Sequence, residues 1–143
     1  MIILDTNVVS ELLRPAPSAQ VEAWLSAQDD TNIYFTTIGE GELRQGLAIL
    51  PAGKRRTALS EEVEGILEKD FRDRIIPFDR SAARAYAAIA AERRAAGRPI
   101  SQFDCQIAAI TRACGAAVAT RNTDDYEGCG IDVIDPWRAS GSS

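Results

Sequence analysis

The chain has 143 residues, of which 45% are hydrophobic and 26% are charged. This composition is typical of a globular protein and excludes a disordered or fibrous chain, and the length suits one domain with its own core. The formal net charge of −5 argues at first against nucleic acid as a partner, because phosphate backbones bind cationic surfaces.

The N-terminal half alternates short strands with helices. An apolar run at residues 2–4 ends on Asp5 and predicts a buried strand. A short helix is expected from Val8 to Leu13, and Ser18 suits the N-cap of a second helix that reaches about residue 27. The composition then predicts, in order, a strand at 33–35, a helix at 37–50 and a longer helix at about 54–69.

The C-terminal half continues the same alternation. A strand is expected at 74–78, where Pro77 indicates a sheet edge or a strand end. Asp79 suits the cap of a helix at 80–96, and Gly97 with Pro99 would end it. Ser101 suits the cap of a helix that runs to about residue 114, and strands are expected at 117–119 and 132–134.

This order of elements predicts an α/β fold. The sheet should be central and mostly parallel, with four to five strands and helices on both faces. We expect a single domain over residues 1–137 and a frayed tail at 138–143, with no internal repeat or linker. Neither a basic leader with a long apolar stretch nor an apolar run of about 20 residues is visible, so the expected location is the cytoplasm, with no membrane association.

Histidine is absent from the chain, which excludes Ser–His and Cys–His nucleophile pairs and histidine metal ligands. The three cysteines Cys105, Cys114 and Cys129 show no CxxC pairing, so we expect packing residues rather than a disulfide framework or a zinc site. Any hydrolytic chemistry must therefore depend on carboxylates, whose natural partners are hard oxygen-binding cations.

Positive charge is concentrated in arginine clusters despite the acidic total. A locally basic rim around an acidic, metal-binding pocket is compatible with RNA binding, so the net charge does not decide the partner. The clusters are Arg72 with Arg74, Arg80 with Arg84, Arg93 with Arg94 and Arg98, and Arg112 with Arg121.

Polar residues follow two of the expected strands. Ligands in an open α/β sheet bind at the carboxyl ends of the strands. Asp5, Thr6 and Asn7 follow the first strand, and the segment 120–125 follows the strand at 117–119. If the two strands are neighbours, both segments share one crevice.

Two further acids, Glu42 and Asp104, lie in the first turns of expected helices. Carboxylates from four separate segments would repel each other strongly unless cations were bound between them. Mg²⁺ or Mn²⁺ is the simplest stabiliser of such a cluster, and such ions can activate water and offset charge on a phosphodiester.

Each acid also has a purely structural explanation. Asp5 could cap the helix that follows it. Lone glutamates such as Glu40 and Glu42 are usually solvated helix-surface charges. Ser101 and Asp104 resemble a capping box with a shortened acid, and aspartates such as those at 124 and 125 are common in turns. The joint placement of the acids, rather than any one of them, favours a functional site.

The same segments, in the same order, resemble the four motifs of the PIN-domain nucleases. The likeness extends from residue 1 to about residue 137, and it is greatest to the VapC/FitB-type toxins, which are PIN-domain ribonucleases paired with a small antitoxin. It implies a PIN-like three-layer fold. The segments are Met1 to Ser10, Glu40 to Gly46, Pro99 to Ala109 and Ala119 to Tyr126.

The resemblance implies roles for the matching residues. Asp5 and Asp104 would bind Mg²⁺ directly, with Mn²⁺ as a substitute, and Glu42 would be a ligand or an acid that orients water. The family often has an aspartate where this chain has Asn122, so the fourth position falls either to Asn122 or to Asp125, which could act through water.

Further polar residues are expected to support these acids and the substrate. Thr6 and Thr120 would orient a carboxylate or a water molecule, and Asn7 would reach Asp5 or a phosphate oxygen. Arg14 and Arg44 are candidates for RNA contact, with solvated helix-surface charge as the alternative. These assignments give hydrolysis of an RNA phosphodiester by metal-activated water in an in-line attack, leaving a 5′-phosphate and a 3′-hydroxyl.

The family likeness also implies a homodimer and a small VapB/FitA-like antitoxin that fills a hydrophobic groove and obstructs the acidic pocket. Trp24 and Phe71 are candidates for that groove, although core packing is the more common role of large aromatic residues at helical spacing.

Two other functions remain open. The first is a non-catalytic PIN-like module that only binds RNA or a partner protein. The second is an aspartate-nucleophile phosphatase, which also keeps an aspartate at the end of the first strand. Such enzymes place a second acid two residues on, where this chain has Asn7, and they need a lysine that the chain does not offer near these motifs.

Overall fold

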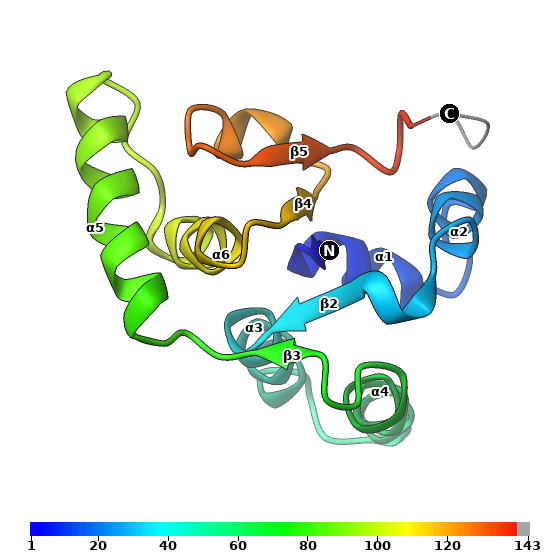
Figure 1. The fold of residues 1–143 in the computed structure, drawn as a ribbon. Helices are drawn as coiled ribbons and strands as arrows, with labels where there is room; N and C mark the ends of the chain where they lie inside the picture. The colour runs from blue at the N-terminus through cyan, green and yellow to red at the C-terminus, as the bar shows by residue number, and fades with distance from the viewer. Residues whose placement is uncertain (140–143) are drawn as a thin grey trace.

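The computed structural model describes residues 1–139, which form a five-stranded parallel sheet in the order β3-β2-β1-β4-β5 (Figure 1). Each neighbouring pair is parallel, so the expected α/β class and the mostly parallel sheet of four to five strands are confirmed. The strands are β1 (Ile2–Leu4), β2 (Ile33–Thr36), β3 (Ile75–Ile76), β4 (Ala117–Ala119) and β5 (Asp132–Ile134).

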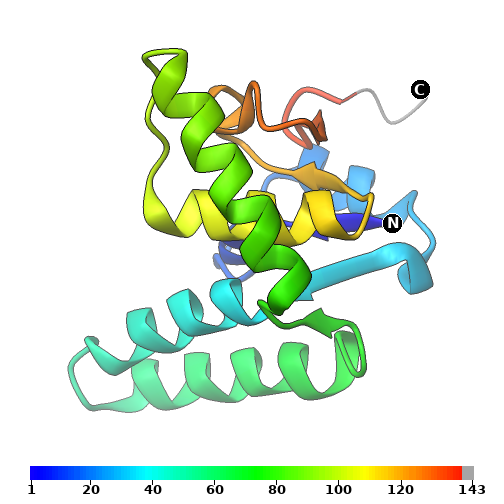
Figure 2. The same cartoon turned by 60° about the vertical axis from the view of Figure 1, so that its left-hand side comes forward.

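Helices cover both faces of the sheet. Figure 1 shows α5 and α6 on one side and α1 and α2 on the other. Figure 2 shows α3 and α4, in cyan and green, as a pair of helices that run side by side below the sheet. The helices are α1 (Thr6–Leu12), α2 (Ala19–Ser26), α3 (Thr37–Ala48), α4 (Lys54–Gly65), α5 (Arg80–Ala95) and α6 (Gln102–Ala113).

The predicted helix caps are present. The side chains of Ser18, Asp79 and Ser101 accept hydrogen bonds from backbone N–H groups in the first turns of α2, α5 and α6. Gly97 and Gly115 follow α5 and α6 with φ of 73° and 63°, the left-handed conformation that commonly ends a helix.

Two predicted elements differ from what the structure contains. The helix expected at 54–69 ends as an α-helix at Gly65 and continues as a π-helical segment, Ile66–Asp70. The strand expected at 74–78 is reduced to Ile75–Ile76 because Pro77 has no N–H to extend the ladder. This strand is at the sheet edge, as predicted.

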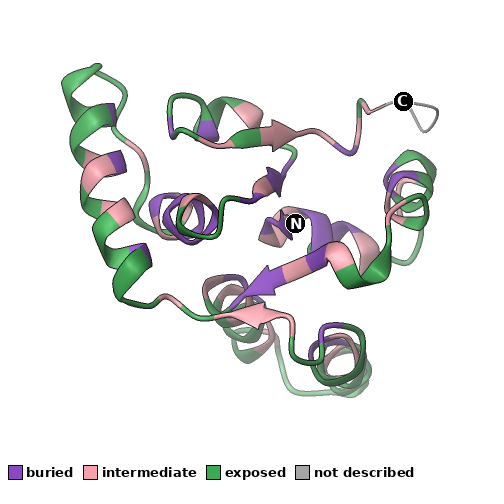
Figure 3. Cartoon of the chain, viewed as in Figure 1, coloured by how far each residue is buried: buried purple, intermediate pink, exposed green. Residues whose placement is uncertain are grey.

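The sheet divides the interior into two apolar clusters. Ile3 and Val118 face the cluster beneath α5 and α6, whereas the next residues along each strand, Leu4 and Ala119, face the cluster beneath α1 and α2. Figure 3 shows the buried residues along both sides of the central strands. The central strands are therefore apolar throughout, as expected for a parallel sheet covered on both faces.

Burial decides the roles of several residues. Trp24 and Phe71 lie in the core beneath α1 and α2, so core packing rather than a docking groove is their role in the structure. Cys105 and Cys129 are buried, as expected, but Cys114 is exposed because it caps the C-terminus of α6 beyond the packed face, so the prediction for that residue was wrong.

The C-terminal segment is ordered at least to Ala139, whose N–H donates to the carbonyl of Asp135 at 2.8 Å. Residues 140–143 of the expected tail lie outside the described residues. Within residues 1–139, the helices lack the combination of length and apolarity that a membrane span requires.

Gly39 provides a test of the core packing. A Cβ atom at this position would lie 2.5 Å from Cζ of Phe35, a buried ring stacked on Phe71. Gly39→Ala should lower the free energy of unfolding by about 1–3 kcal/mol, because the rigid ring cannot move away. Urea denaturation measures the change.

Gly41, in the same helix, is the matched control, because a Cβ atom there meets nothing within 4 Å. Gly41→Ala should stabilise the protein by roughly 0.5–1 kcal/mol through helix propensity. Equal effects at the two positions would contradict the close packing of Gly39 on Phe35.

Candidate active site

The carboxyl ends of β1 and β4 meet because the two strands are neighbours, the condition under which the sequence predicted a shared crevice. Leu4 pairs with Ala119 in the sheet, and the N–H of Asp5 donates to the carbonyl of Ala119 at 2.9 Å. Asp5 and Thr120, the first residues after β1 and β4, therefore lie side by side. They border a cleft of about 480 Å³ that is also lined by Glu42 and Asp104.

The Asp5 side chain accepts hydrogen bonds from the segment after β1 and from the segment after β4. It is 5% exposed, and its Oδ2 accepts from Thr120 Oγ1 at 2.8 Å and from Asn7 Nδ2 at 3.3 Å. Its Oδ1 accepts from the Thr6 N–H at 2.8 Å, so the side chain also caps α1. The structural and functional explanations of this acid are thus compatible, because the cap fixes the carboxylate at the edge of the cleft.

A hydrogen bond between side chains links α1 to α3. Thr6 Oγ1 donates to Glu42 Oε1 at 2.7 Å, which fixes the glutamate above the start of α1. Thr120 Oγ1 in turn accepts from the Asn122 N–H at 3.0 Å. The two threonine hydroxyls therefore orient carboxylates directly, and Glu42 is more than a solvated helix-surface charge.

Asp104 enters the cleft from the first turn of α6. Its backbone N–H donates to Ser101 Oγ, the helix cap, while its side chain remains directed to the cleft. Tyr126 OH lies 3.5 Å from Asp104 Oδ1 and donates to it. Tyr126 is 1% exposed, so this phenol brings a buried donor to an otherwise acidic site.

Burial raises the pKa of all three acids. The pKa of Asp5 rises to about 6, mainly through desolvation, and the hydrogen bonds from Thr120 and Thr6 oppose the rise. The pKa values of Glu42 and Asp104 are also raised, first by desolvation and then by neighbouring carboxylates. Desolvation and the adjacent acids raise the pKa of Tyr126 as well, so it remains a neutral hydrogen-bond donor. The site thus disfavours unbalanced negative charge and favours a cation.

The structure does not decide between Asn122 and Asp125 for the fourth acidic position. Asn122 lines the cleft, whereas Asp125 is exposed and does not line it. The charge of Asp125 nevertheless contributes to the raised pKa of Asp104. Either residue can therefore influence the site, the first through its place in the cleft and the second through its charge.

A buried arginine anchors the turn that carries these residues. Arg93 of α5 is 6% exposed and donates to the carbonyls of Asp125 and Glu127, each at 2.8 Å. It also donates to the carbonyl of Arg98 at 2.6 Å. These bonds flank Tyr126 and hold the turn against α5 and its C-terminal loop.

The two arginines proposed for RNA contact lie in different places. Arg14 lines the cleft and forms an ion pair with Glu11 at 3.3 Å. Arg44 is paired with Glu40 and Glu64 on the outer surface of α3 and α4 and is not among the residues that line the cleft. The structure thus brings Arg14 to the cleft and leaves Arg44 outside it.

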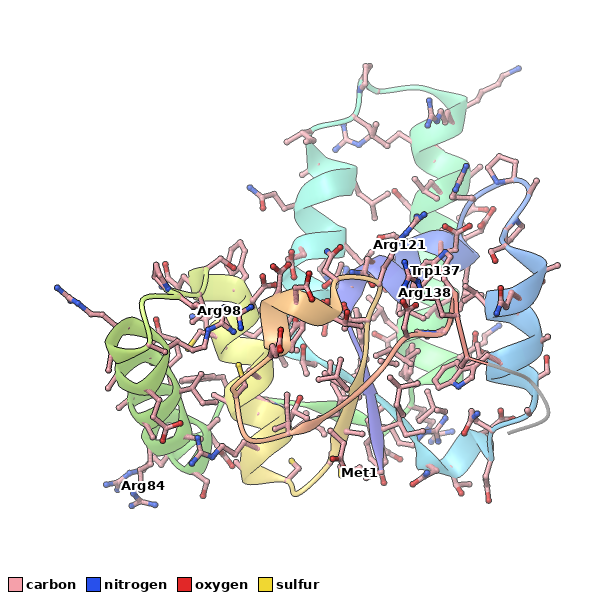
Figure 4. All side chains as sticks on the ribbon, turned by 90° about the horizontal axis from the view of Figure 1, so that it is seen from above. Met1, Arg84, Arg98, Arg121, Trp137 and Arg138 are labelled. Carbon is pink, nitrogen blue, oxygen red and sulfur yellow. The ribbon has the colours of Figure 1, made fainter. Side chains whose placement is uncertain are left out.

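Three further residues belong to the site, although no individual role was predicted for them. Tyr126 approaches Asp104, while Arg121 and Trp137 line the cleft together (Figure 4). Tyr126 is the last residue of the fourth motif and Arg121 lies inside it, so membership of the motif was an available signal. Trp137 gave none, because its place depends on the path of the chain after β5.

The donor set fits Mg²⁺ or Mn²⁺. Asp5, Glu42 and Asp104 offer only oxygen atoms, which these ions prefer. Within residues 1–139, no three Asp, Glu, Cys or His side chains already converge closely enough to surround an ion. Mg²⁺ is usually held by one or two carboxylates and several waters, so the more open arrangement suits it.

The buried carboxylate makes a prediction about stability and pH. The pKa of Asp5 in the folded protein is about 6 against an ordinary value of 3.8, so the unfolded chain loses this proton at a lower pH than the folded protein. The metal-free protein should therefore lose stability as pH rises from about 4 to 6 and keep the deficit above that range.

Asp5→Asn removes this charge; its amide oxygen can accept from the Thr6 N–H, while its NH₂ group takes the place of the oxygen that faces Thr120 and Asn7. The difference in unfolding free energy between the variant and the wild type, measured in EDTA, should favour the variant by about 2–3 kcal/mol more near pH 7.5 than near pH 4. Urea denaturation at both pH values measures it, with the exposed Asp132→Asn as control. A gain that is the same at both pH values would contradict the raised pKa.

Comparison with known proteins agrees with this geometry. The chain matches the family model described as "PIN domain" over residues 2–128. It is 45% identical to the plasmid stability protein StbB of Pseudomonas syringae pv. tomato, over 97% of this chain and 100% of that protein. It is 44% identical to a VapC ribonuclease of Sinorhizobium fredii, over 96% and 98% of the two chains.

The fold has a close counterpart among solved structures. The crystal structure of FitAcB from Neisseria gonorrhoeae superimposes with a TM-score of 0.92 at 39% identity, covering 97% of this chain and 100% of that one. The resemblance of the four sequence motifs to the PIN-domain nucleases and the PIN-like three-layer fold are thus confirmed. The chain belongs to the PIN-domain family, and within it to the group that contains the VapC and FitB proteins.

Proposed function

We propose that the protein is a Mg²⁺- or Mn²⁺-dependent endoribonuclease that hydrolyses RNA phosphodiester bonds. The observation that carries this proposal is the meeting of Asp5, Glu42 and Asp104 from three separate elements in one cleft, with pKa values raised by burial. The similarity to a VapC ribonuclease at 44% identity supports the choice of RNA as substrate.

The chain's own residues have distinct tasks in this reaction. Asp5 and Asp104 would hold the ion, and Glu42 would bind it or orient the attacking water. Thr6 and Thr120 fix the carboxylate oxygens by hydrogen bonds at 2.7 and 2.8 Å, so the acids need little rearrangement before reaction. When bound, the ion would activate water and offset the charge that develops on the phosphodiester.

The alternative of a non-catalytic binding module has less support. All three acids expected of a nuclease are present, and their side chains are held at the cleft rather than dispersed over the surface. The phosphatase alternative lacks its second acid, since the Asn7 side chain donates to Asp5 from that position.

Regulation by an antitoxin is part of the same proposal. The protein is 39% identical to the toxin FitB of Neisseria gonorrhoeae over 96% of this chain. An apolar groove of about 550 Å³ lies between α1, α3 and α4, lined by leucines such as Leu13, Leu47 and Leu59. It shares Thr6, Ser10, Arg14 and Glu42 with the acidic cleft, so a segment in the groove would reach the acids. The homodimer and the cytoplasmic location expected from the family are also proposed.

Asp104→Asn tests the nuclease. With purified protein, structured RNA should be cut only when Mg²⁺ or Mn²⁺ is present. The cleavage rate of the variant should fall by more than about 100-fold. A fall of roughly 10–100-fold is typical when the substituted residue only supports a metal ligand. The helix cap is retained, because Ser101 accepts from the backbone of residue 104.

Asp132→Asn, exposed on β5, should retain full cleavage and serves as the control. Cleavage that persists in EDTA or in Asp104→Asn would contradict the assignment. Intact RNA that is nevertheless retained by the folded protein in a gel shift would favour the binding module.

Ala58→Glu tests the groove. Ala58 is exposed and lines the groove, so a charge there would have to be buried beneath an occupying segment. When a tagged variant is co-expressed with its antitoxin, we expect at least about 10-fold less antitoxin to be retained than with the wild type. Ala83→Glu, exposed on α5, is the matched control, and equal retention by both variants would exclude this groove as the docking site.

A further inference from the structure

Arg121 and Trp137 form a cation–π pair at the rim of the acidic cleft. The guanidinium carbon of Arg121 lies 5.1 Å from the centre of the Trp137 ring, and both side chains line the cleft. Figure 4 shows the two labelled side chains together, close to the start of α1. The pair joins the end of β4 to the segment after β5.

Both residues are fixed by their surroundings. Arg121 directly follows Thr120, and its N–H donates to Asn7 Oδ1 at 3.3 Å. The Trp137 N–H donates to Asp135 Oδ1 at 2.9 Å, and its partly buried ring packs against the core beneath α1 and α2. The backbone of Arg121 is therefore tied, through Asn7, to the hydrogen bonds that hold Asp5, and Trp137 is held separately by Asp135 and the core.

The charge of Arg121 is available to a ligand. Arg14, the other arginine of the cleft, is paired with Glu11. Arg121 forms no ion pair with any carboxylate of residues 1–139 and stays exposed. Stacking occupies one face of a guanidinium and leaves its N–H edge free, the edge that binds phosphate oxygens in pairs.

We propose that Arg121, braced by Trp137, binds a backbone phosphate of the RNA beside the phosphodiester that is cleaved at the acids. This inference rests on the proposed nuclease function and assigns one substrate contact within it. An acidic cleft repels a polyanion, and a single unpaired cation at its rim gives the RNA a fixed point of attachment. Trp137 contributes by holding the guanidinium plane rather than by carrying charge.

The test measures RNA binding in the Asp104→Asn background, where RNA is not cut, over a series of salt concentrations. Arg121→Gln should raise Kd by about 3–10-fold and reduce the slope of log K against log salt by about one. Trp137→Leu should also raise Kd but leave the slope unchanged, because the positive charge remains. Arg84→Gln, on distant α5, should match the parent in both quantities (Figure 4).

With Asp104 restored, Arg121→Gln should raise KM while kcat stays within about two-fold, because the contact lies outside the bond that breaks. A Kd and salt slope equal to those of Arg84→Gln would overturn the phosphate contact, even if the wild type cleaves RNA. A weaker Kd with an unchanged slope would also overturn it, since a lost phosphate contact must release fewer counterions. Wild-type protein that neither binds nor cuts RNA would overturn both this inference and the proposed function.

Discussion

The parallel pairing of β1 with β4 is the constraint on which the site depends. It places the ends of two strands that are more than 110 residues apart in sequence side by side, so that Thr120 can donate to Asp5 at 2.8 Å. The Asp5 carboxylate is thereby held in a desolvated position, where its charge is costly. Thr6, Asn7 and Thr120 support this carboxylate by hydrogen bonds, and Glu42 and Asp104 add further negative charge beside it.

Charged side chains in and around the cleft fall into two groups, those in ion pairs and those without an ionic partner within residues 1–139. Arg44 is neutralised by glutamates on the outer surface of its own helix pair, and Arg14 by Glu11. Asp5, Glu42 and Asp104, by contrast, form no ion pair within residues 1–139 and accept hydrogen bonds from hydroxyl and amide donors. Three carboxylates thus meet at the cleft without a cationic partner, whereas Arg14 and Arg44 are each paired with glutamates. An overall charge of −5 conceals this difference.

Much of the fold could be predicted from sequence because its signals are local. Apolar runs gave the strands, and Ser18, Asp79 and Ser101 marked the helix starts. The three acids could also be grouped, because parallel strands deliver their carboxyl ends to one edge. Their roles came from family resemblance rather than from spacing.

The features that could not be predicted depend on tertiary distances. The ion pair of Arg44 with Glu64 joins α3 to α4, and the contact of Arg121 with Trp137 joins the ends of two different strands. No periodicity in the sequence reports such contacts. The exposure of Cys114 likewise depends on where α6 leaves the packed face rather than on the usual burial of cysteine.

The anchoring of the turn at residues 125–127 by Arg93 has a consequence for substitutions. Arg93 donates to the carbonyls of Asp125 and Glu127, and a carbonyl is the same in every residue type. The side chains at these two positions can therefore change without removing the hydrogen bonds from Arg93. The arginine has no such freedom, because no other side chain presents the same planar fork of donors. Replacement of Arg93 in α5, outside all four motifs, would thus disturb the turn beside the acidic cleft although the sequence of the turn is unchanged.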